Sequence, residues 1–332
     1  NTSVFHLIER CEPVINSISL CQTSDASKLI LKNVKMKNTV LSILLSLLGV
    51  LGLFAQSEKN VNFAFTDAQD LTMLGQLFPD NPNPFQRVDT TRFKGFSAGE
   101  SRQVRSSTGI ICAFRTNSTI ISVKPEYGET LFPSNTMGLS ARGFDLYIKK
   151  DNQWLYAASA VSGDKALNNQ LMIINNMDGE EKECLLYLPI YSELKSLKVG
   201  VQQGRTLLPL ENPFRHRIVF FGSSFTHGIS TSRAGMNYPS QLGRATGLHV
   251  LNLGCSGNCK LQPYFCDVLC AADADAAVLH IGCGMDSRVL RVGTMNHKWY
   301  DVDFPEVIEE RKRYFTESAD YRMLAGYARD CT

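Results

Sequence analysis

The sequence predicts two kinds of sheet in succession: an antiparallel β-sandwich, then a doubly wound parallel α/β sheet. Residues 61–210 contain short runs of alternating apolar and polar residues separated by turn residues, which is typical of antiparallel strands. After Arg215, short apolar runs alternate with helix-length segments, which is typical of parallel strands joined by crossover helices. A chain of 332 residues is long enough to give each part its own core.

The composition is that of a globular protein, with 44% hydrophobic and 20% charged residues. The net charge of +2, with no run of Lys or Arg, gives no electrostatic reason to expect a nucleic acid as partner. The oligomeric state is left open.

Residues 36–55 have the pattern of a signal peptide. Met36 and a basic residue precede the apolar stretch 40–54. This stretch fits a signal-peptide core and is shorter than the roughly 20 residues that span a bilayer; a buried core helix is the alternative. We expect cleavage after Ala55, a secreted or periplasmic protein, and no stable membrane span afterwards. Residues 1–35 are interpreted as an upstream segment without a native role.

The β-rich region, residues 56–212, contains three predicted hairpins. Their turns are placed at Thr116–Ser118, Asp151–Asn152 and Asp178–Gly179. In the first hairpin Ile110, Cys112 and Phe114 should share one face. The segment GQLFPDNPNPFQR, with three prolines, is predicted to be a surface loop, and Leu207–Pro213 a linker.

The second region predicts a regular alternation of strands and helices. Expected strands are 217–221, 248–253, 276–281, 298–302 and 322–328, and expected helices are 238–246, 260–272 and 305–315. Right-handed crossovers would place all five strands in one sheet.

Small-residue turns follow the first two of these strands. GSSFTHG contains Ser224, and NLGCSGN contains Gly257. Because the carboxyl ends of parallel strands meet at one edge of a sheet, we expect Ser224 and Gly257 to lie close together. A serine beside free backbone N–H groups suits acyl transfer, since the N–H groups can stabilise an oxyanion. An ordinary Ser/Gly-rich turn is the alternative.

These two blocks carry a resemblance. Residues 61–277 resemble a two-domain SGNH (GDSL-type) hydrolase of the carbohydrate-esterase kind, and RFKGFSAGESRQVRSSTGI and LPIYSELKSLKVGV resemble its N-terminal domain. The resemblance implies a carboxylic ester hydrolase with Ser224 as nucleophile, Gly257 in the oxyanion hole, an acylated carbohydrate as substrate and no cofactor.

One part of that family's pattern is missing. Its D-x-x-H block is absent: neither His280 nor His297 has an aspartate three residues before it, and the third-block asparagine is absent too. His227 lies on the same turn as Ser224, which disfavours it as the base. We therefore expect impaired catalysis, because general acid–base catalysis contributes about 10²–10⁴-fold to rate.

The C-terminal residues carry a second resemblance. Residues 278–331 resemble a fragment of a class I methyltransferase of the leucine carboxyl methyltransferase-like family. The resemblance implies S-adenosylmethionine as a possible cofactor of this fragment. Gly282 and Gly284 would form the glycine loop, Asp303 would bind the ribose, and Asp330 would lie near the adenine.

The sequence is thus interpreted as a chimera joined near residues 278–282. The predicted segments are 1–35, the signal 36–55, the sandwich 56–212, the hydrolase part 213–278 and the methyltransferase-like fragment 279–332. The expected function is an exported esterase by descent; the alternatives are a remnant that binds S-adenosylmethionine and a non-catalytic glycan-binding protein.

No metal is expected, because Cys255, Cys259, Cys266 and Cys270 do not have zinc-site spacing. Cys266 and Cys270 should pack in the core.

Overall fold

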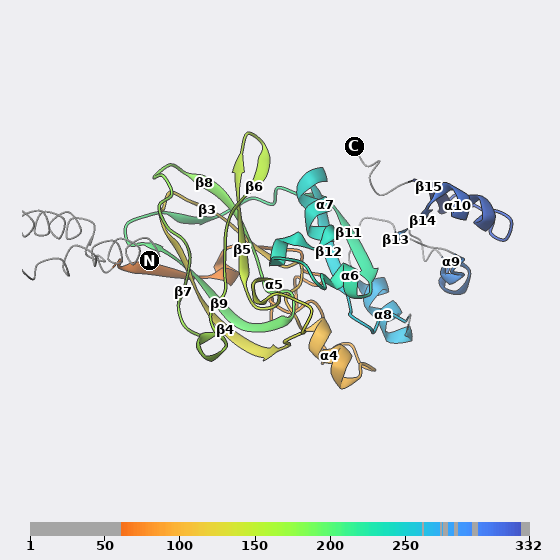
Figure 1. The fold of residues 1–332 in the computed structure, drawn as a ribbon, viewed down its shortest axis with the longest axis horizontal. Coiled ribbons are helices and arrows are strands. Elements are labelled where there is room, and N and C mark those ends of the chain that lie inside the picture. The colour runs from red at the N-terminus through yellow and green to blue at the C-terminus, as the bar shows by residue number, and fades with distance from the viewer. Residues whose placement is uncertain are drawn as a thin grey trace, which may run out of the picture. The chain divides into compact units, whose positions relative to one another are not determined.

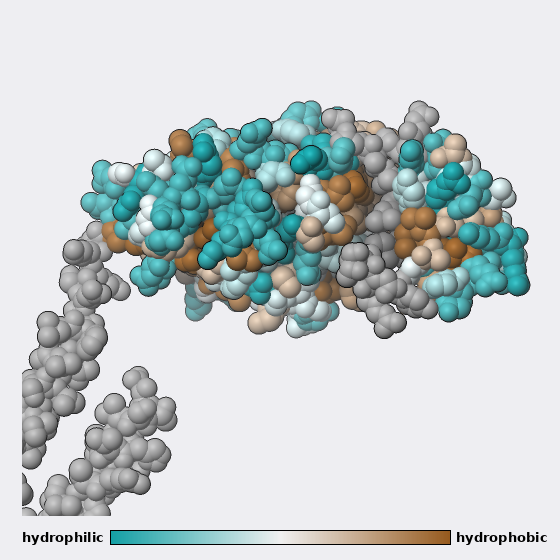
Figure 2. All heavy atoms as spheres, turned by 90° about the horizontal axis from the view of Figure 1, so that it is seen from above, coloured by the Kyte–Doolittle hydropathy of each residue, from teal (hydrophilic) through white to brown (hydrophobic). Residues whose placement is uncertain are grey.

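The computed structural model describes residues 61–326 except 261, 273, 275–277, 282–284 and 294–297. The predicted upstream segment 1–35 and signal peptide 36–55 therefore lie outside the described residues. Within the described part, no helix is both long enough and apolar enough to cross a membrane. Figure 2 shows hydrophilic residues over much of one face of this part, with hydrophobic residues gathered between them.

Two antiparallel sheets form the first part of the structure (Figure 1). The four-stranded sheet has the order β1 (Phe63–Asp67), β9 (Ser192–Gln202), β4 (Ile121–Thr130) and β7 (Leu171–Ile174). The six-stranded sheet has the order β10 (Leu207–Pro209), β3 (Ile111–Thr116), β8 (Lys182–Tyr187), β5 (Phe144–Lys150) and β6 (Gln153–Ala160), with β2 (Thr72–Leu74) also paired to β3. Buried side chains from both sheets form one core.

Strand β3 of the six-stranded sheet is buried on both faces. Cys112 and Phe114 of β3, together with Ile110 just before it, face the core shared with the four-stranded sheet, as the alternating pattern predicted. Ile111 and Ala113 point the other way, into a second core that includes Phe214. The sheet therefore joins the antiparallel part to the part that follows residue 212.

Only one of the three predicted hairpins forms. β5 and β6 pair across Asp151–Asn152, and both turn residues have positive φ, as a type I′ turn requires. The hairpins predicted at Thr116–Ser118 and Asp178–Gly179 are wrong, because β3 and β8 lie in the six-stranded sheet while β4 and β7 lie in the four-stranded one. Short polar turns here connect two sheets, which the local pattern cannot distinguish from a hairpin.

Two segments predicted to be loops contribute to the packing. Residues 75–87 are not a surface loop: Leu77 and Phe78 pack against β12, and Arg87 is fully buried. The predicted linker Leu207–Pro213 begins with β10, which pairs with β3. In both places long-range contacts override the prolines that suggested exposure.

The next elements form a small parallel α/β layer. β11 (Arg215–Gly222) pairs in parallel with β12 (Leu248–Gly254). The other elements of this layer are α6 (Ser224–His227), η3 (Ala234–Met236), α7 (Tyr238–Thr246) and α8 (Pro263–Ala271). The short elements η1 (Ala68–Asp70), α4 (Ala98–Val104), α5 (Gly138–Ala141) and η2 (Asp164–Ala166) belong to the antiparallel part.

Helix α7 coincides with its predicted range because its end signals are local. The Asn237 side chain accepts the N–H of Ser240, and Pro239 lies in the first turn. Gly247 ends the helix with a φ of 74°. Helix α8 is shorter than predicted, and its Cys266 and Cys270 are half-buried and exposed rather than in the core.

A third sheet contains the C-terminal strands β13 (Val278–Ile281), β14 (Trp299–Asp303) and β15 (Tyr321–Ala325), all parallel. Helices α9 (Arg288–Val292) and α10 (Pro305–Arg311) accompany them. The predicted parallel direction is correct. The single five-stranded sheet is not what the described residues form, since the hydrogen bonds of β13 go to β14 and β11–β12 is a separate sheet.

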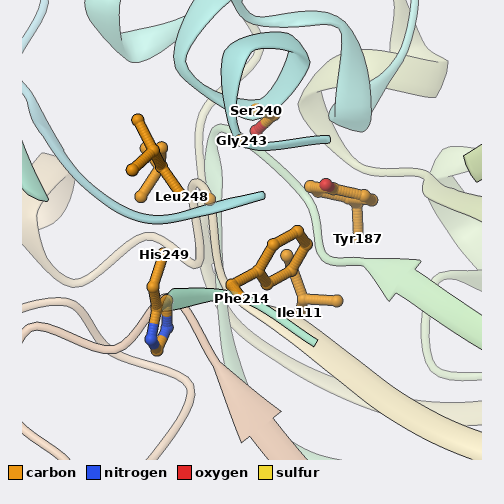
Figure 3. Close-up of a pocket in the computed structure, with 9 residues that line it drawn as sticks. Ile111, Tyr187, Phe214, Ser240, Gly243, Leu248 and His249 are labelled. Atoms are coloured by element: carbon orange, nitrogen blue, oxygen red, sulfur yellow. The ribbon is translucent and has the colours of Figure 1, made fainter. Parts of the chain in front are cut away.

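The antiparallel part and the β11–β12 layer pack closely together. Figure 3 shows the side chains that meet where β3 and β8 approach α7 and β12: Ile111, Tyr187, Phe214, Ser240, Leu248 and His249. The hollow between them has a volume of about 10 Å³, which is the size of one water molecule. This contact is therefore a packed interface and leaves no room for a substrate.

We predict that Phe144→Ala lowers the free energy of unfolding by about 3–5 kcal/mol, because Phe144 is fully buried in the core between the two antiparallel sheets. The matched control is Phe132→Ala, at a ring that is 55% exposed; it should cost less than about 1 kcal/mol. Urea unfolding followed by fluorescence measures both, and equal losses would contradict the assignment of this core.

Candidate active site

Ser224 lies where a parallel strand turns into a helix. It is the first residue of α6, directly after β11, and its side chain is half-buried. Gly222 permits this turn, because a Cβ there would lie 2.0 Å from Thr226 Oγ1. The N–H of Ser224 donates to Ser223 Oγ at 2.6 Å, so this N–H already has an acceptor on the neighbouring residue.

Gly257 lies at the same edge of the sheet, after the neighbouring strand. Gly222 at the end of β11 pairs with Gly254 at the end of β12, and the N–H of Cys255 donates to Gly222 O at 2.8 Å. The two turns that contain Ser224 and Gly257 therefore leave adjacent strands side by side. This is the arrangement that the sequence predicted for them.

The second turn has a defined type. The N–H of Asn258 donates to Cys255 O at 3.1 Å, which closes a β-turn with Ser256 and Gly257 in its centre. Gly257 has a φ of +73°, and Ser256 is not among the residues with positive φ. These values are those of a type II turn, which favours glycine at its third position.

His227 is a buried structural residue of this site. Its Nε2 faces the carbonyl oxygen of Ile190 at 3.1 Å, which can only accept, so Nε2 carries the hydrogen and Nδ1 is the acceptor. The N–H of Ser256 donates to Nδ1 at 3.4 Å. Burial, and then the charge of Arg87, hold the pKa of His227 well below 6.5. His227 is thus neutral, and both of its ring nitrogens are engaged in hydrogen bonds. This agrees with the expectation that it is not the base.

Ser256 makes contacts through each of its polar groups. Its Oγ lies 2.7 Å from the hydroxyl of Tyr191 and 3.3 Å from His227 Nδ1. Its carbonyl oxygen accepts from Gln103 Nε2 at 2.9 Å and from Asn258 Nδ2 at 3.0 Å. Gln103 and Tyr191 come from the antiparallel part, so that part contributes directly to this turn.

Arg87 binds the carboxyl end of β12 through hydrogen bonds. Its guanidinium donates to the carbonyl oxygens of Asn252 at 3.1 Å and Gly254 at 2.8 Å. It also donates to the carbonyl oxygens of Gln103 and Ser106 and to Ser106 Oγ. Arg87 is not among the site residues predicted from the sequence, because nothing local marks an arginine in a proline-rich segment as buried.

Asp145 connects β5 to the segment before α7. It is fully buried and accepts the N–H of Gly235 at 3.0 Å, with Arg233 Nε at 3.3 Å. Burial raises the pKa of Asp145, and the bond from Gly235 and the charge of Arg233 offset part of that rise. The sequence pattern of Phe144–Lys150 predicts only a strand, the one that precedes the hairpin turn at Asp151–Asn152. The signal was available: a carboxylate among apolar strand residues needs a buried partner.

The residues predicted to bind S-adenosylmethionine are only partly described. Gly282, Gly284 and Asp330 lie outside the described residues, as does His297. Asp303 is the last residue of β14, and its Oδ1 accepts the N–H of Phe304 at 2.8 Å. Its carboxylate thus lies at the carboxyl end of the middle strand of a parallel sheet. Among the described residues no cluster of His, Cys, Asp or Glu could hold a metal ion.

Family models match most of the described chain. Residues 63–207 match the model GxDLY, described as the N-terminus of SGNH-hydrolase-type esterases, and residues 143–147 read GFDLY. Residues 215–289 match the GDSL-like lipase/acylhydrolase family.

Two solved structures are similar. One, described as a GDSL-like lipase from Bacteroides ovatus, is 32% identical, with a TM-score of 0.66 over 76% of this chain and 80% of that one. The other is a salicylyl-acyltransferase from a tetracycline biosynthetic pathway, 15% identical, with a TM-score of 0.54 over 81% of this chain and 86% of that one. At that identity the second shows a common fold alone.

A curated relative matches a short segment. The tetracenomycin polyketide synthesis O-methyltransferase of Streptomyces glaucescens is 47% identical over 57 residues, which is 17% of this chain. The chain spans about a fifth of the length of that relative, 21%.

We predict that His227 makes stability depend on pH. Its pKa is lowered in the folded chain, so below pH 6.5 the unfolded chain binds a proton that the folded chain does not. The contribution of the neutral His227 to the free energy of unfolding is therefore fully present above pH 6.5. It is lost as the pH falls below 6.5, by up to about 1.4 kcal/mol per pH unit. His227→Gln should remove this part of the slope in urea unfolding measured at several pH values. His216→Gln, at an exposed histidine of β11, should keep it; equal slopes in wild type and His227→Gln would refute the prediction.

Proposed function

Because the chain belongs to the GDSL-like lipase/SGNH hydrolase family, we propose that Ser224 is the nucleophile of an ester-hydrolysing site and that the Gly257 N–H is an oxyanion donor. The observation that supports this most directly is the pairing of Gly222 with Gly254, which brings the two turns to one edge of the β11–β12 sheet.

The chemistry follows from these positions. Ser224 Oγ attacks the ester carbonyl carbon, and the carbonyl oxygen becomes an oxyanion that a backbone N–H can stabilise. The ester C–O bond then breaks, the alcohol leaves with a proton, and water hydrolyses the acyl-serine. The Ser224 N–H could serve as a second donor once Ser223 Oγ releases it.

We propose that turnover is weak because the described residues place no free general base at Ser224. The contacts of His227 go to Ser256, Ile190 and Ser106, and burial holds its pKa well below 6.5. The D-x-x-H block that supplies a base in this family is absent from the sequence. An esterase site without its general base should retain the contributions of substrate binding and the oxyanion donors.

The substrate and location are proposed from the same resemblance. We propose an acyl ester on a carbohydrate, with acetyl as the acyl group, and an exported enzyme directed by residues 36–55. An exported esterase could reach polysaccharide outside the cell, and the candidate signal peptide supports that location.

A second candidate function belongs to the C-terminal strands. The 47% identity to a methyltransferase over 57 residues and the carboxylate of Asp303 at the end of β14 favour binding of S-adenosylmethionine by this fragment. When bound, that cofactor supplies a methyl group; Asp303 would orient its ribose through the hydroxyl groups. Transfer to an acceptor is not part of this proposal.

We predict that the protein releases p-nitrophenol from p-nitrophenyl acetate slowly, with kcat about 10²–10⁴-fold below the ~10 s⁻¹ of a typical enzyme. Ser224→Ala should reduce the rate to that without protein. Ser230→Ala, at an exposed hydroxyl on the following turn, should leave it unchanged. Mass spectrometry should find the acetyl group on Ser224. A wild-type rate in Ser224→Ala would refute the proposed nucleophile.

We predict saturable binding of labelled S-adenosylmethionine in equilibrium dialysis. Asp303→Asn should weaken it about tenfold or more, because a charge-assisted hydrogen bond to a ribose hydroxyl is lost. Asp320→Asn, at an exposed carboxylate before β15, is the matched control and should bind like wild type. Absence of saturable binding by the wild type would exclude this second function.

A further inference from the structure

We propose that Gln103, from the antiparallel part, is a positioning residue that holds the Gly257 N–H in the direction in which it would serve as the oxyanion donor of Ser224. The proposal rests on the proposed function, since it explains how that site keeps its oxyanion donor in place. Gln103 lies near the end of α4 (Ala98–Val104), and its side chain crosses to the turn after β12.

The geometry of the turn links the Ser256 carbonyl to the Gly257 N–H. Ser256 and Gly257 are the central residues of a type II turn, and the bond between them is trans. In a trans peptide the C=O of Ser256 and the N–H of Gly257 point in opposite directions. Whatever holds the Ser256 carbonyl therefore also sets the direction of the Gly257 N–H.

The alternative turn would reverse that direction. Type I and type II turns differ mainly in ψ of the second residue and φ of the third, which together rotate the central peptide by about half a turn. A type I turn at Cys255–Asn258 would keep the bond from the Asn258 N–H to Cys255 O. It would nevertheless point the Gly257 N–H away from its present side.

Two side chains hold the carbonyl in the type II orientation. Gln103 Nε2 donates to Ser256 O at 2.9 Å and Asn258 Nδ2 donates at 3.0 Å, so both lone pairs of the oxygen are used. Rotation of the peptide would break both bonds. Asn258 belongs to the turn and moves with it, whereas Gln103 belongs to another element and can act as an external anchor.

The Gln103 side chain has no other polar role among the described residues. Its Oε1 is buried and accepts no hydrogen bond there. Leaving a buried acceptor unsatisfied is costly, so a glutamine is expected here only if its N–H₂ group is needed. Within the part of the chain that the structure describes, the acceptor that this N–H₂ group contacts is the Ser256 carbonyl.

The helix that carries Gln103 is itself fixed. Arg87 donates to the Gln103 carbonyl oxygen, and Ser97 and Glu100 form a capping box at the start of α4. Glu100 also accepts from Gln262 Nε2 at 2.7 Å and from the Tyr264 hydroxyl, which binds α4 to α8. The anchor is therefore rigid relative to the turn that it holds.

The test makes the same change, glutamine to glutamate, at two positions. Gln103→Glu keeps the size of the side chain but removes the donor, and it should lower the rate of Ser224 acetylation by p-nitrophenyl acetate about tenfold or more, with the apparent KM unchanged. An oxyanion donor acts in the transition state, so its loss should affect kcat rather than KM. The control is Gln241→Glu, because Gln241 Nε2 also donates to a backbone carbonyl, that of Met236, at 2.8 Å.

A second measurement does not need activity. In ¹⁵N-glycine-labelled protein, the Gly257 amide resonance, assigned from Gly257→Ala, should move in Gln103→Glu and stay in place in Gln241→Glu. The proposal is overturned if Gln103→Glu leaves this resonance where it is in wild type, or if it slows acetylation no more than Gln241→Glu does. Lack of Ser224-dependent acetylation in wild type would instead refute the proposed function, while the resonance still decides whether Gln103 orients the peptide.

Discussion

The guanidinium of Arg87 has five N–H donors and no contact with water, so the protein must supply every acceptor. It does so with oxygens from three places: the segment after α4, the carbonyl of Gln103 and the end of β12. None of these acceptors is a carboxylate, so the positive charge is not neutralised by its hydrogen bonds. Losing one acceptor would leave a buried charge partly unpaired, which is costly. Because the acceptors include the carbonyl oxygens of Gln103 and Gly254, this cost couples α4 to the turn that contains Gly257.

The positive charge of Arg87 also acts on the residues around Ser256. It contributes to the lowered pKa of His227, which lies between Ser256 and the antiparallel part. The same field favours negative charge at the neighbouring turn, which is what an oxyanion requires. The antiparallel domain therefore does more than support the site. Through Arg87, Gln103 and Tyr191 it supplies hydrogen bonds to the end of β12 and to the turn that follows, where the proposed function places an oxyanion.

The sequence predicted what local signals determine. Helix α7 has its cap, its proline and its terminal glycine within the helix and its flanks, and Asp151–Asn152 form a turn that only certain residues favour. The serine and glycine turns followed from strand order alone. What the sequence could not predict depends on distant partners: β3 and β4 part into different sheets, residues 75–87 become buried, and Asp145 finds its partner at Gly235. No period or turn preference encodes such pairings.

The C-terminal strands show how burial separates two similar carboxylates. Asp301 and Asp303 lie two residues apart on β14 and so share a face, and their sequence context is nearly the same. Asp301 is fully buried and bound to Arg311 and to the hydroxyl of Tyr321, so it serves the core of this sheet. Asp303 stands at the strand end, where a ligand could reach it. The two parallel sheets therefore end in different groups: Ser224 follows β11, and the carboxylate of Asp303 closes β14. Stabilising an oxyanion and moving a proton are distinct contributions to rate, so under the proposed function the β11–β12 edge would keep the first without the second.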